Sequence, residues 1–265
     1  MKRLGIVRHR FAQPLSSGLR SGAGRSAFEL IESGGAGTAE LAVRLRRGEL
    51  DGSYLSPIDY AREYARWRIV PSVGVSSEKE SAAITLLFRE GLHHINSIAA
   101  DPGAASEIVL AHLIFSEKYG IAPAIIPLAA PGKEALGKAD AVLLAGDQAL
   151  EASPATNRLD LVDEWYDITG LPYVHGFWVS PPDALTPSEL ELIVEAGLRA
   201  PATPEGQAQH DAALSRFRYR FDDEERAALA EFYRIAYYHG ILKDIPDLNL
   251  HSLGNRTPIS PISAN

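Results

Sequence analysis

The segment that decides the fold is residues 139–178, which begins ADAVLLAGDQAL and ends DLVDEWYDITGLPYVHGFW. Its apolar run at 141–145 is short and is followed by Gly146, which is typical of a buried parallel strand and not of a helix. In open α/β sheets, ligands bind beyond the carboxyl ends of such strands. We therefore expect Gly146 and Asp147 to lie at a ligand-binding crevice.

The second half of this segment has the pattern of a helix followed by a strand. Residues 159–169 place Leu161 and Trp165 on one helical face, and Gly170 follows as a stop signal. The aromatic-rich run 171–179 then indicates a strand that leads away from the helix. The whole segment predicts a strand, an acidic turn, a helix and a second strand.

Strands and helices alternate through the rest of the chain, which predicts a doubly wound α/β architecture. The expected strands are 4–7, 28–32, 50–55, 97–100 and 122–128, and the expected helices include 38–48, 106–119, 187–198, 204–218 and 222–238. The stretch 16–26 is rich in Gly, Ser and Arg, and we expect a mobile surface loop there. The Asn-, Pro- and Ser-rich tail after 253 is expected to be disordered.

Two extended segments, 82–88 and 171–179, lie where the chain could cross between two lobes. Two crossings predict a discontinuous first lobe, residues 1–90 plus 180–253, around a second lobe, residues 91–179, with 254–265 as a flexible tail. A ligand is then expected in the cleft between the lobes, with a hinge at the crossing segments.

Composition excludes several classes of function. The chain has 265 residues and is 46% hydrophobic, enough for one large core or for two lobes of ~130 residues. A net charge of −8 argues against nucleic acid as a partner, and the absence of cysteine excludes disulfides, thiolate zinc sites and cysteine nucleophiles. Neither a secretory leader nor a membrane span is recognisable, so we expect a cytoplasmic protein with no membrane partner. The oligomeric state cannot be inferred from the sequence.

Three basic residues, Arg8, His9 and Arg10, follow the first expected strand and would lie at the edge of the cleft. The planar guanidinium of arginine suits a carboxylate, so this loop is a candidate site for an acidic small molecule. The alternative is a solvated basic loop without a binding role.

The turn Gly103 to Ser106 is the second candidate, because it opens a helix directly after a strand. Small residues such as Ala104 let backbone N–H groups approach an anion, although an ordinary turn capped by Ser106 fits the same pattern. Asp147 could orient a ligand hydroxyl or cap its own turn, and His175 fits a buried core or hinge histidine better than a site residue. The residues alone indicate no nucleophile, metal or cofactor.

The segment around Gly146 also carries a resemblance to a known family. Gly146-Asp147 with Ala149-Leu150, then Asp160-Leu161, Glu164-Trp165 and the run 169–174 ending at Trp178, resembles the chorismate dehydratase family. The resemblance covers about residues 3–180, including 55–60, LSPIDY, which contains Ser56, and weaker similarity extends over 217–240. The resemblance implies a two-lobed fold like that of type II periplasmic binding proteins. It also implies a lyase without cofactors that acts in the futalosine route to menaquinone.

Such a lyase removes water from chorismate and leaves 3-enolpyruvoylbenzoate. This chain departs from the family pattern at the expected site, where Phe11 replaces an asparagine and Ala83, with Ser81 nearby, aligns with a serine. Ser106-Glu107 replaces a Thr-Ser pair at the second-lobe helix. The residues expected to bind the substrate are Arg8, His9, Arg10, Phe11, Ser56, Ser81, Ala83, Gly103, Ala104, Ser106, Asp147 and His175, whereas the catalytic residue is not identified.

Two alternatives to the dehydratase remain open at this point. The first is a protein that binds a small cyclic or aromatic carboxylate without reacting with it. The second is a lyase of the same pathway that acts on a cyclic futalosine derivative. In each case the expected partner is a small-molecule carboxylate.

Overall fold

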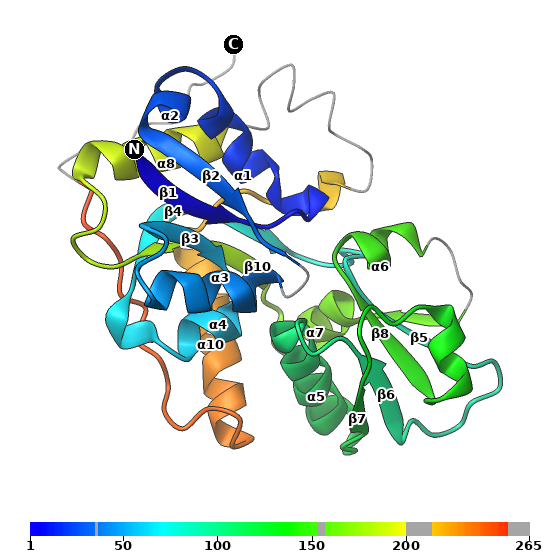
Figure 1. Ribbon diagram of the computed structural model, residues 1–265. Helices are drawn as coiled ribbons and strands as arrows, with labels where there is room; N and C mark the ends of the chain where they lie inside the picture. Colours follow the sequence, from blue (N-terminus) through cyan, green and yellow to red (C-terminus); the bar gives the residue numbers. More distant parts are fainter. Residues whose placement is uncertain (35–36, 153–156, 200–213, 254–265) are drawn as a thin grey trace, which may run out of the picture.

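The computed structural model describes residues 1–34, 37–152, 157–199 and 214–253, which form two lobes, each built on a five-stranded sheet (Figure 1). The first sheet has the order β2-β1-β3-β10-β4, with β1 Lys2–Ile6, β2 Phe28–Glu32, β3 Gly52–Leu55, β4 Arg68–Ser77 and β10 Tyr173–Ser180. The second has the order β7-β6-β8-β5-β9, with β5 Ile84–Phe88, β6 Ser97–Ala100, β7 Ala124–Pro127, β8 Ala141–Ala145 and β9 Arg158–Asp160. These mixed sheets confirm the predicted two-lobed α/β fold.

In the first sheet, β1 runs parallel to both β2 and β3, so the carboxyl ends of these strands meet at one edge. Strand β10 is antiparallel to β3 and β4, and all of its side chains are buried. The helices of this lobe are α1 Pro14–Ser17, α2 Gly22–Ala27, α3 Gly37–Arg46, α4 Pro57–Ala61, α8 Pro187–Arg199 and α10 Asp223–Tyr238.

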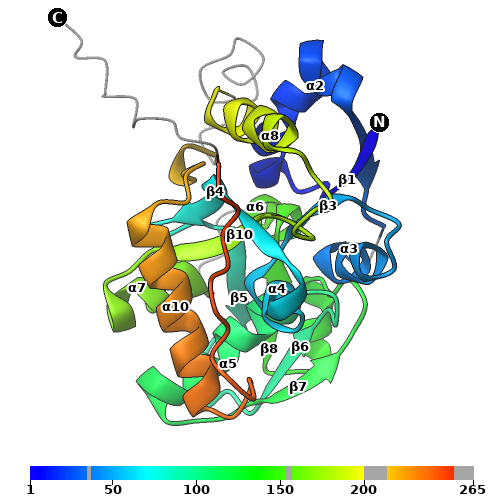
Figure 2. The ribbon, with the colours of Figure 1, turned by 90° about the vertical axis from the view of Figure 1, so that its left-hand side faces the viewer.

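The second sheet carries α5 Ala105–Tyr119, α6 Asp147–Glu151 and α7 Leu161–Thr169. One apolar cluster runs from this lobe into the first, because Trp165 of α7 packs edge-on against Phe232 of α10 at 5.8 Å between ring centroids. Figure 2 shows α10 of the first lobe running beside α5 and α7 of the second. The lobes are therefore joined by buried apolar contacts as well as by the chain.

The chain crosses between the sheets twice, before β5 and before β10. By sheet membership, β1 to β4 and β10 belong to lobe 1, so the chain leaves lobe 1 after Ser77 and returns to it at Tyr173, whereas β5 to β9 belong to lobe 2. Both crossings lie earlier in the chain than the expected boundaries at 90 and 180, because β5 pairs with β8 and β10 pairs with β3.

The prediction of a loop at 16–26 was wrong, because most of these residues are helical in α1, α2 and the 3-10 turn Gly18–Arg20. Leu19 is 1% exposed, and a Cβ on Gly18 would lie 2.9 Å from the Cα of Ala196 in α8. The small residues thus serve close helix packing and not mobility.

Two further expectations fall largely or wholly outside the described residues. The expected helix 204–218 is described only from 214, where Leu214–Arg216 form a 3-10 turn and Arg218 pairs with Ser76 as an isolated bridge. The expected disordered tail, 254–265, is not described. Over the described ranges, no helix is long and apolar enough to cross a membrane.

Candidate functional site

A cavity of about 330 Å³ lies between the lobes, a size within the range of ~300–1,000 Å³ typical of small-molecule sites. Lobe 1 contributes the residues that follow β1, the end of β3 and the first turns of α3 and α4. Lobe 2 contributes the first turn of α5 and the end of β8. The lining residues are Arg8, His9, Phe11, Ser33, Gly34, Gly37, Thr38, Tyr54, Ser56, Asp101, Gly103, Ala104, Glu107, Ala130, Pro131, Leu143, Ala145, Asp147, Gln148 and His175.

Aromatic rings form the cavity wall after β1. The ring of His9 stacks on Phe11 at 5.4 Å, and Phe11 stacks on Phe217 at 5.1 Å. His175 packs against both phenylalanines, and its Nε2 lies 2.7 Å from the Ser77 hydroxyl. Phe11, which stands where the family pattern has asparagine, is therefore part of a packed aromatic cluster and not an isolated replacement.

Burial favours the neutral form of both cavity histidines. Burial lowers the pKa of His9 below its ordinary value of 6.5, although the charge of Asp147 opposes the shift. Burial, together with the neighbouring His9, lowers the pKa of His175 to about 3. A neutral imidazole can accept a proton from a ligand.

The loop after β1 also holds the two lobes together. The backbone N–H of Arg10 donates to Asp147 Oδ1 at 2.9 Å, and the Arg10 Nε lies 3.7 Å from the same oxygen. Gly146 has a φ of 62°, and a Cβ there would lie 2.3 Å from His9 Nδ1. The turn after β8 consequently requires glycine both for its backbone and for the close approach of His9.

The two arginines expected to bind a carboxylate have different surroundings. Arg8 lines the cavity, but its side chain is 74% exposed and its Nε donates to Glu32 Oε2 at 3.0 Å. Arg10 is not among the lining residues and contacts Asp147 across the lobes. Arg8 is thus placed at the mouth of the cavity, whereas Arg10 lies behind its wall.

On the side of lobe 2, the first turn of α5 opens into the cavity. Ala104 is the N-cap of α5 and makes no side-chain capping hydrogen bond. The hydroxyl of Ser106 points away from the cavity and accepts the backbone N–H of Ile58 at 3.0 Å. Ser106 was expected to bind the ligand, but in the structure it joins α5 to α4.

Glu107, one residue further along α5, lines the cavity. Burial raises the pKa of its carboxyl to about 7; its own backbone N–H opposes the shift, and the charge of Asp59 adds to it. Glu107 therefore exchanges a proton near neutral pH, a property common among residues that act as general acids. The sequence marked Glu107 only as a departure from the family pattern.

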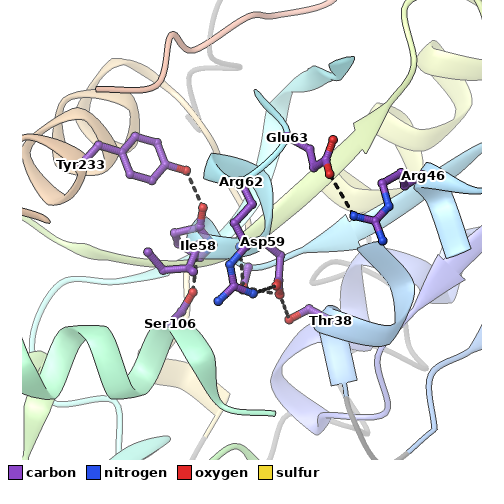
Figure 3. A network of polar contacts seen from close by, with 10 residues as sticks. Thr38, Arg46, Ile58, Asp59, Arg62, Glu63, Ser106 and Tyr233 are labelled. Carbon is purple, nitrogen blue, oxygen red and sulfur yellow. Dashed lines mark hydrogen bonds and ion pairs between the residues drawn. The ribbon is translucent and has the colours of Figure 1, made fainter. Parts of the chain in front are cut away.

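Behind Thr38 and Ser56, which line the cavity, lies an acid with several partners. Asp59 is 2% exposed, and its Oδ2 accepts the hydroxyl of Thr38 at 2.6 Å (Figure 3). The same oxygen accepts the hydroxyl of Ser56 at 2.8 Å. Arg62 Nη1 lies 3.4 Å from the Oδ1 of Asp59. Thr38, the first residue of the helix expected at 38–48, donates its hydroxyl to Asp59.

Tyr54 is the third polar group that sequence reasoning missed. It is 3% exposed and lines the cavity, and its hydroxyl has no hydrogen-bond partner within the described part of the chain. Its ring fits because Gly176 lacks a side chain: a Cβ there would lie 2.4 Å from Tyr54 Cζ. Burial raises its pKa well above 10, with Glu107 adding to the shift, so Tyr54 remains a hydrogen-bond donor.

The structure brings eight of the expected residues to the cavity, namely Arg8, His9, Phe11, Ser56, Gly103, Ala104, Asp147 and His175. Besides Arg10 and Ser106, two others lie outside its lining. Ser81 Oγ accepts the Ala83 N–H at 3.1 Å, and the Ala83 carbonyl accepts the Gly146 N–H at 2.8 Å. Among the described side chains, no group of three or more His, Cys, Asp or Glu could hold a metal ion.

The fold and the family of this chain are shown by comparison with known proteins. By structure, it resembles protein AF1704 from Archaeoglobus fulgidus, with a TM-score of 0.67, 17% identity and coverage of 91% of this chain and 98% of that one. It also resembles the periplasmic aliphatic sulphonate binding protein SsuA from Escherichia coli, with a TM-score of 0.61, 15% identity and coverage of 93% and 95%. At these identities the likeness shows the periplasmic-binding-protein-like fold alone.

By sequence, the chain is 26% identical over 260 residues to a chorismate dehydratase of Thermus thermophilus, covering 86% of this chain and 93% of that protein. A sequence profile described as menaquinone biosynthesis matches residues 3–238, which is most of the chain. The chain therefore belongs to the menaquinone biosynthesis family.

Proposed function

We propose that this protein is a hydro-lyase that removes water from chorismate and forms 3-enolpyruvoylbenzoate, in the futalosine route to menaquinone. The observation that carries the proposal is Glu107, an acid with a pKa of about 7 in an interlobe cavity of a size suited to one small molecule. The similarity to a chorismate dehydratase supports the choice of substrate.

The reaction breaks one C–H bond and one C–O bond of the ring, and the electrons of the C–H bond complete an aromatic ring. A base must take the ring proton, and an acid must protonate the hydroxyl as it leaves as water. Aromatisation favours the products, so the protein's main task is to orient the substrate between these two groups.

The cavity contains a candidate for each role. We assign the proton donor to Glu107 in its protonated form, because no other described protein side chain pairs with its carboxyl. We assign the proton acceptor to His9, which burial keeps neutral. Arg8, at the mouth, is the lining guanidinium that could exchange Glu32 for a ligand carboxylate.

The test is to incubate the purified protein with chorismate and to follow the products by chromatography with mass detection, beside a control without protein. A new species lighter by one water supports the proposal. Unchanged chorismate, under conditions in which a dehydratase of the family turns it over, contradicts it.

One observation favours a second candidate, a binding protein without catalysis. Phe11 fills the place of a polar family residue and is stacked between His9 and Phe217. Calorimetric titration of chorismate separates the two functions. Saturable heat of binding without any product supports the binding protein, whereas product formation excludes it.

A further inference from the structure

The hydroxyls of Thr38 and Ser56 both face the cavity, and each has its single hydrogen committed to the protein. Both donate to the same oxygen of Asp59, Thr38 at 2.6 Å and Ser56 at 2.8 Å, and Figure 3 shows the Thr38 contact. A hydroxyl has one hydrogen and two lone pairs, so a hydroxyl that donates to Asp59 can only accept from a ligand. A carboxylate, which has only acceptors, gains nothing from such a wall.

The contacts of Asp59 hold its carboxylate in place, and the carboxylate in turn fixes the direction in which the two hydroxyls donate. Its side chain is 2% exposed, its backbone N–H lies 3.4 Å from Ser56 Oγ, and Arg62 Nη1 approaches its second oxygen at 3.4 Å. Because Asp59 does not line the cavity, it can act on a ligand only through Thr38 and Ser56.

Tyr54 supplies independent evidence that a polar ligand group belongs at this wall. Tyr54 and Ser56 are two residues apart on extended backbone, so their side chains leave the same face. The Tyr54 hydroxyl is buried without a partner in the described structure, and leaving such a group unpaired costs roughly 1–3 kcal/mol. A ligand oxygen that accepts from Tyr54 and donates to Thr38 or Ser56 would satisfy both requirements. A hydroxyl is the common group that does so.

We propose that Asp59 is a positioning residue that makes Thr38 and Ser56 hydrogen-bond acceptors, so that this wall recognises a ring hydroxyl of the ligand and not a carboxylate. The inference rests on the proposed function only in taking the ligand to be a cyclic carboxylic acid. The wall formed by Thr38 and Ser56 would orient the ligand so that the ligand's hydroxyl faces lobe 1 and the ligand's carboxylate lies away from this wall.

Two probes that share a ring and a carboxylate test the inference by calorimetry on the full chain. Shikimate carries ring hydroxyls, and cyclohex-1-ene-1-carboxylate is the same ring acid without them. We expect shikimate to bind about tenfold more tightly or better, since its hydroxyl can make two hydrogen bonds at this wall and each contributes roughly threefold to tenfold in affinity. Equal affinities, including no detectable binding of either probe, would overturn the inference.

Variants then test which side chain causes the difference in affinity between the two probes. Thr38→Val keeps the shape of the side chain and removes the acceptor, so the ratio of the two affinities should fall about threefold to tenfold. Thr38→Ser should restore it, and Thr186→Val, on the exposed start of α8, should leave it unchanged. An unchanged ratio in both Thr38→Val and Ser56→Ala would contradict the role of this wall.

Asp59→Asn separates positioning from structure. The amide of the new side chain can donate to one hydroxyl, which frees the hydrogen of that hydroxyl to point into the cavity. The affinity ratio should therefore fall although both hydroxyls remain, in protein shown to be folded by its thermal unfolding. A folded variant with the full ratio would refute the positioning role.

The binding test of this inference and the turnover test of the proposed function can fail independently. Discrimination between the probes without turnover of chorismate would leave the inference standing and remove the lyase. Turnover of chorismate with equal affinities for the two probes would leave the lyase standing and remove the inference.

Discussion

Two helices begin at the cavity, and their first turns differ in how the protein treats an acid. In α4, Ser56 caps the helix, and the first-turn acid Asp59 accepts two hydroxyls. In α5, Ala104 provides no cap, and the first-turn acid Glu107 faces the cavity with only its own backbone N–H as a partner among the described residues. The two helix starts adjoin, because Ser106 accepts the N–H of Ile58.

The difference separates a structural acid from one that is available to a ligand. A carboxylate near a helix N-terminus is favoured by the helix dipole in either case. Asp59 uses that position to fix neighbouring hydroxyls, whereas burial without a neutralising partner leaves Glu107 with a raised pKa.

The largest effect is expected from Glu107→Gln, which preserves size and removes the exchangeable proton. If Glu107 is the proton donor, the rate of chorismate dehydration should fall by about a hundredfold or more. Glu151→Gln, the same change at an exposed position at the end of α6, is the matched control and should retain the rate. A Glu107→Gln protein with nearly full activity would remove Glu107 from the chemistry.

For the free energy of unfolding, we expect Asp59 to matter more than an exposed acid in the first turn of a helix. Asp59→Ala leaves the hydroxyls of Thr38 and Ser56 without their acceptor, and should lower the free energy of unfolding by roughly 2 kcal/mol. Asp163→Ala, at an exposed first-turn position of α7, should cost less than about 1 kcal/mol. Urea unfolding measures both variants, and equal losses would mean that Asp59 is no more structural than a surface acid.

The pH dependence of stability should reveal Glu107 directly. The pKa of its carboxyl is about 7 in the folded protein, against an ordinary value of 4.5 that applies to the unfolded chain, so the unfolded chain releases the proton first. The contribution of Glu107 to wild-type stability should therefore fall as pH rises from 4.5 to 7, and Glu107→Gln should gain roughly 2–3 kcal/mol relative to the wild type over that window. Burial of His175, whose pKa is about 3, acts in the opposite direction but equally in both proteins. A constant difference between them from pH 5 to 8 would contradict a raised pKa at Glu107.

The strand at 141–145 could be predicted because its burial leaves a short apolar run, which Gly146 ends. The error at 16–26 shows the limit of composition as a guide. There, Gly18 is small because α8 packs against it, and that contact comes from a segment almost 180 residues away. Local sequence does not contain this information.

The site was predictable in location but not in chemistry. The loop after β1, the start of α5 and the end of β8 were all expected at the cleft, because strand ends and helix starts converge there. Tyr54 and Thr38 were missed because each has an ordinary local explanation, a strand aromatic and a helix cap. Only pairing at long range, such as Thr38 with Asp59 or Tyr54 with Gly176, distinguishes them from core residues.

The smallest effect tests whether the start of α5 is left uncapped for a ligand. A hydroxyl at position 104 could accept a first-turn N–H, so Ala104→Thr should be about 0.5–1 kcal/mol more stable than Ala104→Val, which has the same shape without the oxygen. If the bare turn binds a ligand anion, the more stable Ala104→Thr should also bind chorismate more weakly than Ala104→Val, because its hydroxyl occupies the same N–H groups. Thermal unfolding and calorimetry of this pair give both numbers. A gain in stability with no difference in affinity would show that α5 merely lacks a cap and that ligand recognition lies with Glu107 and the wall of lobe 1.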